Sequence, residues 1–256
     1  MIKKMLALAI VLTTVLMVLA SCSGTDKTDN PPPIDLEENP ASDFEYEYDA
    51  PINGIEIKNY IGPSLRVRIP EKIEGSPVIS IGEDAFRDRR ITEVYIPNSV
   101  TLIGNYAFYR CIGLTSITIP DGVTQIGGGA FFGCTGLTNI TIPNSVTYIG
   151  DSAFYGCASL TNITIPDGVT QIGGGTFFGC TGLTSITIPD SVTKIGSSAF
   201  AYCTGVTNIT SPDSVTEIGK DALVDCTGYA TYKGNTYNLS NSDTVNALYA
   251  AINGGQ

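Results

Sequence analysis

A block of 23 residues recurs six times in this chain, and this repeat limits the folds that the chain can adopt. The clearest copy covers residues 121–143. Six cysteines keep the same step, at Cys111, Cys134, Cys157, Cys180, Cys203 and Cys226. Ile-Gly pairs and Ile-Pro corners keep it as well. A constant period of about 20 to 50 residues indicates a solenoid, in which each unit stacks only on its neighbours.

One unit can be followed through residues 114–134. Residues 114–119 alternate apolar and polar side chains and are rich in β-branched residues, which predicts a short strand. Pro120 cannot donate to a strand ladder and ends it, and Asp121-Gly122 supplies a turn. The return side, residues 130–134, is expected to form one short helical or 3₁₀ turn. A unit with about six apolar positions cannot bury them alone, so stacking at about 4.8 Å should produce buried columns of like residues.

The spacing Leu-x-x-Ile-x-Ile with this period resembles the leucine-rich repeat. The additional block Ile-Gly-x-x-Ala-Phe-x-x-Cys resembles the narrower BspA-like (Treponema pallidum-type) subfamily of bacterial surface proteins, and the similarity extends over residues 44–256. The resemblance implies a curved, right-handed leucine-rich-repeat solenoid. Its parallel β-sheet would lie on the concave face, and short turns or 3₁₀ segments on the convex face. We assign the repeats to residues 65–228, with one strand in each unit.

Two of the units are almost identical. Residues 121–143 and 167–189 differ only by Ala130/Thr176 and Asn139/Ser185. A more divergent unit lies between them, which indicates duplication of a pair of units. Near-identical copies favour a scaffold over a chain with one unique site.

Both ends of the repeat array depart from the pattern and are predicted to cap it. Residues 44–64 contain two alternating segments around Asn53-Gly54, a strong signal for a β-hairpin. Residues 229–256 contain a second hairpin, around Lys233-Gly234-Asn235, and then a helix that begins at Ser242. The apolar face of this helix consists of Val245, Leu248, Tyr249 and Ile252.

Residues 1–21 have the organisation of a signal peptide, with a charged start and an apolar run. Leu19-Ala20-Ser21-Cys22 resembles a bacterial lipobox, which implies cleavage before Cys22 and lipidation of this residue. The alternative is an ordinary signal peptide in which Cys22 has no such role. Residues 22–43 are polar and contain three consecutive prolines, so we expect a disordered tether. We therefore expect a lipid-anchored protein of the bacterial cell envelope, and the resemblance to surface proteins implies that it faces outward.

The charge balance and the missing residue types exclude several functions. With 25 acidic and 14 basic residues, the net charge is −11, which argues against binding to a nucleic-acid backbone. The chain has no His, which excludes Ser-His-Asp and Cys-His nucleophiles and His-ligated zinc. We therefore expect a protein that is not an enzyme and needs no cofactor.

Two residue columns allow more than one interpretation. The cysteines end apolar blocks, which favours a buried, reduced ladder; disulfides between neighbouring units or metal ligation are the alternatives. A second column follows the proline corners, at Asn98, Asp121, Asn144, Asp167, Asp190 and Asp213. Such side chains cap turns, but a row of carboxylates is also able to hold calcium.

The polar strand positions define the expected binding surface, a regular hydrogen-bonding face on the sheet. They are Glu93, Tyr95, Ser116, Thr118, Asn139, Thr141, Asn162, Thr164, Ser185, Thr187 and Asn208. The resemblance implies that this face binds host matrix proteins or other cells, which is an adhesion role. The alternative is a surface glycan-binding component of a nutrient-uptake system. Rows of amides and hydroxyls suit sugars, but sugar sites usually add an aromatic platform.

The lipobox interpretation can be tested by metabolic labelling with a tagged fatty acid. The change Cys22→Ala should abolish labelling and release the protein from the membrane fraction, because no thiol remains to be acylated. The control Cys157→Ala removes a cysteine of the repeat and should leave labelling unchanged. A wild-type protein that stays unlabelled and soluble in a host that processes lipoproteins would contradict the interpretation.

Overall fold

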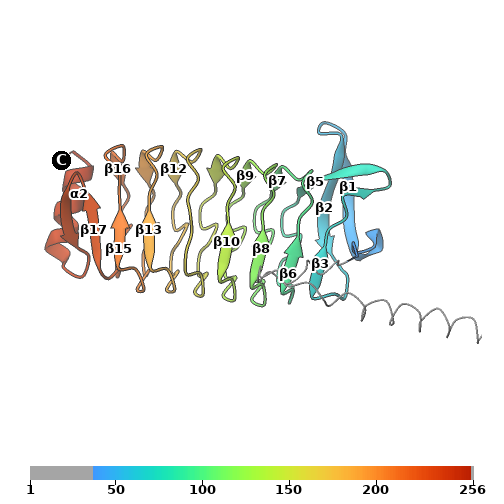
Figure 1. Cartoon of the computed structure of the whole chain (residues 1–256), viewed down its shortest axis with the longest axis horizontal. Coiled ribbons are helices and arrows are strands. Elements are labelled where there is room, and N and C mark those ends of the chain that lie inside the picture. The colour runs from blue at the N-terminus through green and yellow to red at the C-terminus, as the bar shows by residue number, and fades with distance from the viewer. Residues whose placement is uncertain (1–36, 255–256) are drawn as a thin grey trace, which may run out of the picture. The chain divides into compact units, whose positions relative to one another are not determined.

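The structure, a computed structural model, describes residues 37–254, which lie in one compact unit, Glu37–Gln256. The predicted signal peptide, Cys22 and the tether up to residue 36 lie outside the described residues. The compact unit is a β-solenoid whose coils stack in a row from an N-terminal hairpin to a C-terminal helix (Figure 1). The predicted repeat solenoid is confirmed. Among residues 37–254, no helix has both the length and the apolar character needed to cross a bilayer.

The predicted strands of the units belong to a first parallel ladder, except the strand expected just before Pro166, where residue 162 forms only an isolated bridge. Its first group consists of β3 (Arg66–Arg68), β6 (Glu93–Tyr95), β8 (Ser116–Thr118) and β10 (Asn139–Thr141). Its second group consists of β13 (Ser185–Thr187), β15 (Asn208–Thr210) and β17 (Tyr229–Tyr232), and β18 (Asn235–Asn238) is added antiparallel at the end of this sheet. The register follows the repeat, so Ser116 pairs with Asn139 and Ser185 with Asn208. Equivalent residues of successive coils therefore form columns.

The structure also contains a second parallel ladder, which the sequence analysis did not predict. It starts with β2 (Gly54–Tyr60) and β5 (Ser76–Ile81) and continues with β7 (Leu102–Ile103), β9 (Gln125–Ile126) and β11 (Tyr148–Ile149). A separate group consists of β12 (Gln171–Ile172), β14 (Lys194–Ile195) and β16 (Glu217–Ile218). After each strand the coils approach closely: a Cβ on Gly127 would lie 2.5 Å from the Asn105 nitrogen, so only glycine fits there. Strands of two residues are too short to show alternation in a sequence.

The third side of each coil, here called the turn side, consists of successive hydrogen-bonded turns. The expected short turns are present, but residues 128–133 do not form a 3₁₀ helix. The reason is that the backbone switches to the left-handed conformation at two glycines, with φ of 60° at Gly129 and 69° at Gly133. Because the backbone alternates between right-handed and left-handed conformations, amide groups point along the stack. Phe131 N, for example, donates to Ala153 O of the next coil at 2.7 Å. The turn side is thus a third set of hydrogen bonds between coils.

The predicted N-terminal hairpin is present: β1 (Phe44–Asp49) pairs antiparallel with β2. The long turn after β3 forms another hairpin, in which β4 (Lys72–Ile73) pairs with β5 across Glu74 and Gly75, both with positive φ. The compact unit begins earlier than the boundary at residue 44 that the sequence suggested. Before β1 lies a 3₁₀ turn, η1 (Ala41–Asp43), and Asn39 N donates to Arg68 O at 2.9 Å. Residues 37–43 of the expected tether therefore belong to the folded unit.

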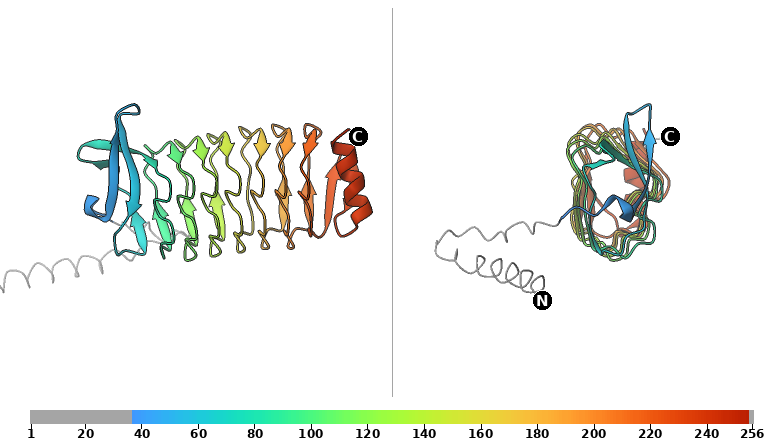
Figure 2. Two further views of the ribbon diagram at one scale, coloured as in Figure 1. Left: turned by 180° about the vertical axis from the view of Figure 1, so that it is seen from behind. Right: turned by 90° about the vertical axis from the view of Figure 1, so that its right-hand side faces the viewer.

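The C-terminal cap ends all three sets of hydrogen bonds. The predicted hairpin closes the first ladder, because β18 pairs antiparallel with β17. The predicted helix is α2 (Ser242–Ile252), and it closes the other two (Figure 2). Asn253 Oδ1 accepts from Ile218 N at 2.8 Å, so a side-chain amide occupies the open edge of β16. On the turn side, the Tyr249 hydroxyl accepts from Leu223 N at 2.8 Å.

The core consists of columns in which one residue type repeats. Phenylalanine rings of neighbouring coils, from Phe86 to Phe200, stack with centroids 5.0 to 5.6 Å apart.

The six cysteines are free and buried, which is the reduced ladder that the sequence favoured. Each thiol donates to a phenylalanine carbonyl, as Cys134 Sγ does to Phe108 O at 3.0 Å. Burial raises the pKa of the Cys111 thiol from 9.0 to about 12. As the pH rises above 9.0, this thiol loses its proton in the unfolded chain but stays neutral in the folded protein. Ionisation favours the unfolded chain, so the free energy of unfolding falls as the pH rises from 9.0 toward 12.

We expect the cysteine column to be unreactive until the protein unfolds, because thiol reagents attack an exposed thiolate. Native protein should react slowly, and unfolding without reductant should release six thiols from the solenoid. Fewer than six would show that disulfides exist. The change Cys157→Ser should lower the free energy of unfolding by about 1–3 kcal/mol in urea denaturation, because it buries a more polar group. The exposed change Thr135→Ser is its control and should stay within about 0.5 kcal/mol of wild type.

Deleting residues 241–256 should leave the edge of β16 and the Leu223 amide open. An open strand edge is a template for pairing with another chain. We therefore expect a lower melting temperature and association in size-exclusion chromatography. The milder change Asn253→Ala removes only the amide at the edge and should cost about 1–2 kcal/mol. A truncated protein as monomeric and as heat-stable as the intact chain would show that the helix is dispensable.

Candidate functional site

The residues predicted to bind a partner belong to the coils of the first ladder, whose strands follow one another along the solenoid (Figure 1), and their outward side is here called the polar sheet face. In each strand of the first ladder the middle side chain is buried and its neighbours point outward, as Ser116 and Thr118 do beside Ile117. The parallel register sets these residues in two columns. The polar sheet face comprises Glu93, Tyr95, Ser116, Thr118, Asn139, Thr141, Asn162, Thr164, Ser185, Thr187 and Asn208.

The polar sheet face carries groups that the fold itself does not use. Within residues 37–254, the hydroxyls of Ser116, Thr118 and Thr141 make no hydrogen bond to another protein group. The neighbouring threonine column differs, because each hydroxyl donates to the carbonyl one coil back; Thr138 Oγ1, for example, donates to Thr115 O at 3.1 Å. The threonine column therefore joins the coils, whereas the polar sheet face has donors and acceptors available for a ligand.

Charged and aromatic groups are concentrated at the N-terminal end of this face. Arg66 Nε lies 2.5 Å from Glu93 Oε2, and the Tyr95 hydroxyl donates to Glu93 Oε1 at 2.9 Å. The hydrogen bond with Glu93 raises the pKa of the Arg66 guanidinium. These contacts hold the Tyr95 ring, which is 36% exposed. Tyr and Arg are the residue types that anchor interfaces most often.

A groove interrupts the middle of the polar sheet face. Asn139 and Asn162 form only an isolated bridge, and in the described part of the chain no strand pairing joins this coil to β13. A cavity of about 530 Å³ lies at the interruption. Its polar lining consists of Asn162, Thr164, Asp167, Ser185, Thr187 and Asp190. Four of these residues belong to the predicted binding set, and the structure brings them together around one hollow.

The interruption coincides with a polar residue in a buried column of alanines. The equivalent residues of other coils include Ala107, Ala130, Ala153 and Ala199. Thr176 is buried in this column, and its hydroxyl donates to Gly173 O at 2.9 Å. Phe154 and Phe177 have the longest ring distance in their column, 5.6 Å, although Phe177 and Phe200 are nearly as far apart, at 5.4 Å. The Ala130/Thr176 difference between two near-identical units was the signal in the sequence.

The second ladder is interrupted at the same coil. Within residues 37–254, β11 and β12 do not pair, and they belong to separate sheets. A cavity of about 400 Å³ lies there, lined by Tyr148, Asp151 and Gln171 among others. The turn side continues through this point, because Phe154 N donates to Thr176 O at 2.9 Å. The coils are thus joined less tightly here on two of their three sides.

Sequence reasoning missed a row of aromatic side chains on the turn side. This aromatic ladder consists of Tyr109, Phe132, Tyr155, Phe178 and Tyr202. Its central rings are parallel and 4.4 Å apart, and all five side chains are partly exposed. The signal for the first four rings was an aromatic residue directly after the buried phenylalanine of each unit. The period predicts buried columns of like residues, but not this second, partly exposed column of rings.

The Asp and Asn column after the proline corners does not cap its own turns. Side-chain hydrogen bonds in these turns come from the following serines, as Ser145 Oγ donates to Val123 O at 2.7 Å. Among residues 37–254, no group of three or more Cys, Asp or Glu side chains is arranged to hold a metal ion. These side chains are surface carboxylates and amides along one edge of the polar sheet face.

Comparison with known proteins gives a consistent result. Residues 79–181 and 101–230 match the family model described as BspA type Leucine rich repeat region, with six copies. The crystal structure of the T. pallidum leucine rich repeat protein is 29% identical with a TM-score of 0.51, covering 72% of this chain and 82% of that chain. A leucine rich cell surface protein from Faecalibacterium prausnitzii A2-165 is 26% identical with a TM-score of 0.52, covering 83% of this chain and 78% of that chain. No curated protein sequence matches this chain.

Proposed function

Because the chain belongs to the family of proteins with BspA-type leucine-rich repeats, we propose that it is a binding protein of the bacterial cell surface and not an enzyme. Its ligand is a macromolecule, either a host matrix protein or a component of another cell. The polar sheet face is the docking surface. The relative from F. prausnitzii is a cell surface protein, which supports this location. Attachment through a lipid on Cys22 and a tether fits the same location.

The groove at residues 162–190 is the observation that carries this proposal. It interrupts an otherwise regular row of polar side chains and gives a partner a recess to enter. The surrounding face is fixed by a continuous core, so little conformational entropy is lost on binding. Ile163 and Ile165 lie at the base of the recess but are buried in the core, so the partly exposed Pro189 is the main apolar contact that the recess offers.

Most contacts on this face would be individually weak. Thr, Ser and Asn are not the residue types that dominate binding energy. The exceptions are Tyr95 with Arg66 at the N-terminal end and the exposed Tyr229, which pairs with Asn208, at the other end. Affinity would therefore come from several coils acting together. A protein partner fits this pattern better than a glycan, because the coils on either side of the groove place no aromatic residue on this face.

The test is a panel of purified extracellular-matrix proteins, probed with the wild-type protein and with a triple variant. The variant Ser116→Lys, Asn139→Lys, Asn162→Lys places three cations and long side chains on the polar sheet face. We expect at least about a tenfold loss of affinity for whichever protein binds the wild type. Stability should change little, because all three side chains point away from the core.

The matched control is Gln125→Lys, Tyr148→Lys, Gln171→Lys. These residues point outward from the second ladder, in a column where Lys194 already occurs naturally. The control has the same added charge and should bind as the wild type does. Equal loss in both variants would show an effect of charge alone. Full binding by the sheet-face variant would move the site to another surface.

A further inference from the structure

The aromatic ladder ends in a ring whose surroundings differ from those of the other rings. Inside a stack, neighbours cover both faces of each ring, as Phe132 and Phe178 do for Tyr155. At the N-terminal end, the Arg87 guanidinium lies over Tyr109, 4.3 Å from the ring centre. Four rings of the ladder are therefore half-buried and accessible mainly at their edges.

Tyr202 is the last ring and breaks the pattern of the ladder. The residue one repeat after Phe178 is Ala201, so the ring comes from the next residue, at a position where the preceding coil has Gly179. Tyr202 keeps the left-handed backbone of that glycine, with φ of 60°. It lies 5.0 Å from Phe178 at a tilt of 52°, and it is 45% exposed. In the described part of the chain no ring follows it, so aromatic surface remains open.

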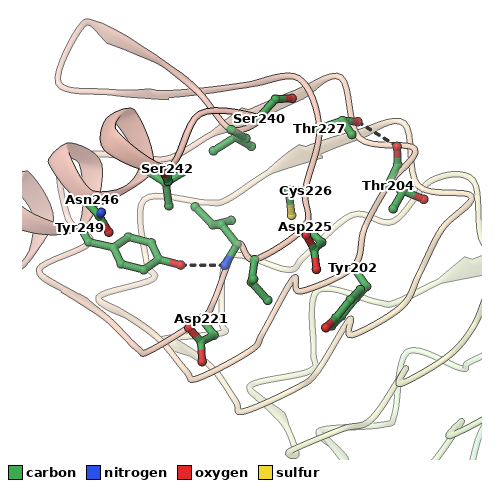
Figure 3. Close-up of a pocket in the computed structure, with 14 residues that line it drawn as sticks. Tyr202, Thr204, Asp221, Asp225, Cys226, Thr227, Ser240, Ser242, Asn246 and Tyr249 are labelled. Carbon is green, nitrogen blue, oxygen red and sulfur yellow. Dashed lines mark hydrogen bonds between the residues drawn. The ribbon is translucent and has the colours of Figure 1, made fainter.

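Tyr202 lines a hollow of about 780 Å³ that also involves α2, here called the C-terminal cavity (Figure 3). Its volume lies within the range of about 300–1,000 Å³ that small-ligand sites occupy. The apolar side chains in its wall are Leu223, Val224, Leu239 and Val245. The polar side chains around them include Thr204, Asp221, Asp225, Ser242 and Asn246.

Several polar groups of the C-terminal cavity have no partner. Within residues 37–254, the side chains of Asp225, Ser242 and Asn246 make no hydrogen bond or ion pair. The Tyr249 hydroxyl differs, because it accepts from Leu223 N and so holds the helix in place (Figure 3). The cavity thus has a fixed wall and a set of unused donors and acceptors.

We propose that the C-terminal cavity binds a neutral carbohydrate, with Tyr202 as the platform on which one sugar ring stacks. One face of a sugar ring is lined by C–H groups, which pack against an aromatic face and against the apolar wall. Sugar hydroxyls both donate and accept hydrogen bonds. The carboxylates of Asp221 and Asp225 accept, and the Asn246 amide both donates and accepts, so the two sets match.

The charges in the cavity select among small ligands. Two carboxylates and a net charge of −11 disfavour sulfated and sialylated sugars. A cationic ligand needs acceptors only, whereas Thr204, Ser242 and Asn246 also present donors. Asp221 also lies 3.9 Å from the ammonium group of Lys220. The inference concerns a different surface from the polar sheet face and does not depend on the function proposed for that face.

The test uses the full-length protein on an array of neutral hexose and N-acetylhexosamine oligosaccharides, with sulfated and sialylated members included. Calorimetry with the best neutral oligosaccharide, and separately with spermidine as a cationic probe, gives affinities. The change Tyr202→Gly removes the platform and restores the residue type of the preceding coil, which suits the positive φ. We expect it to weaken neutral-sugar binding about tenfold or more. Asn246→Ala should weaken binding too, and Tyr202→Phe should retain it.

Tyr148→Ala is the control, since Tyr148 is exposed on the second ladder and takes no part in the cavity. It should leave sugar affinity unchanged, as should the lysine triple on the polar sheet face. If no matrix protein binds while sugar binding is intact, only the function proposed for the polar sheet face would be wrong. Absence of neutral-sugar binding, a preference for spermidine or sulfated sugars, or full binding by both Tyr202→Gly and Asn246→Ala would overturn the inference. Thermal melts of each variant exclude loss through unfolding.

Discussion

Hydrogen bonds between successive coils are the constraint on which the rest of this structure depends. They occur on all three sides of the solenoid, in two strand ladders and along the turn side. Because each coil is bonded to the next in one register, every side chain lies beside its own equivalents. Each position therefore has to tolerate stacking on itself. Phe and Ile do so inside, glycine where coils approach closely at Gly127, and short polar residues outside.

The same constraint makes the two ends different from the middle. An uncapped coil would expose three rows of unpaired backbone groups, which are templates for association. The N-terminal end uses β1 beside β2 to cover one of these rows. The C-terminal end uses a different device for each row: the strand β18, the amide of Asn253 and the hydroxyl of Tyr249. A helix that looks like a simple lid thus supplies individual hydrogen bonds to the last coil.

The sequence predicts the features that repeat and are locally patterned. The strand at residues 116–118, the buried cysteines and the outward position of Ser116 and Thr118 follow from alternation and period. The second ladder does not, because a pair such as Gln125-Ile126 is too short to carry a period. The groove lies between the coil of Asn162 and the coil of Thr176, and a single Thr in a column of alanines does not predict where strand pairing stops. The aromatic ladder depends on ring orientation, which neighbouring letters such as Phe131-Phe132 do not specify.

The weaker joint beside Thr176 has a consequence for how this protein comes apart. Stability in a repeat protein is a sum of terms for each coil and for each contact between neighbours. Where both strand ladders are interrupted, the contact term falls, while the turn side keeps the coils in line. The core columns and the turn side still cross this joint, as the stacked rings of Phe154 and Phe177 show. We therefore expect an unfolding front that starts at either end to pass this point less cooperatively than it passes the other coils.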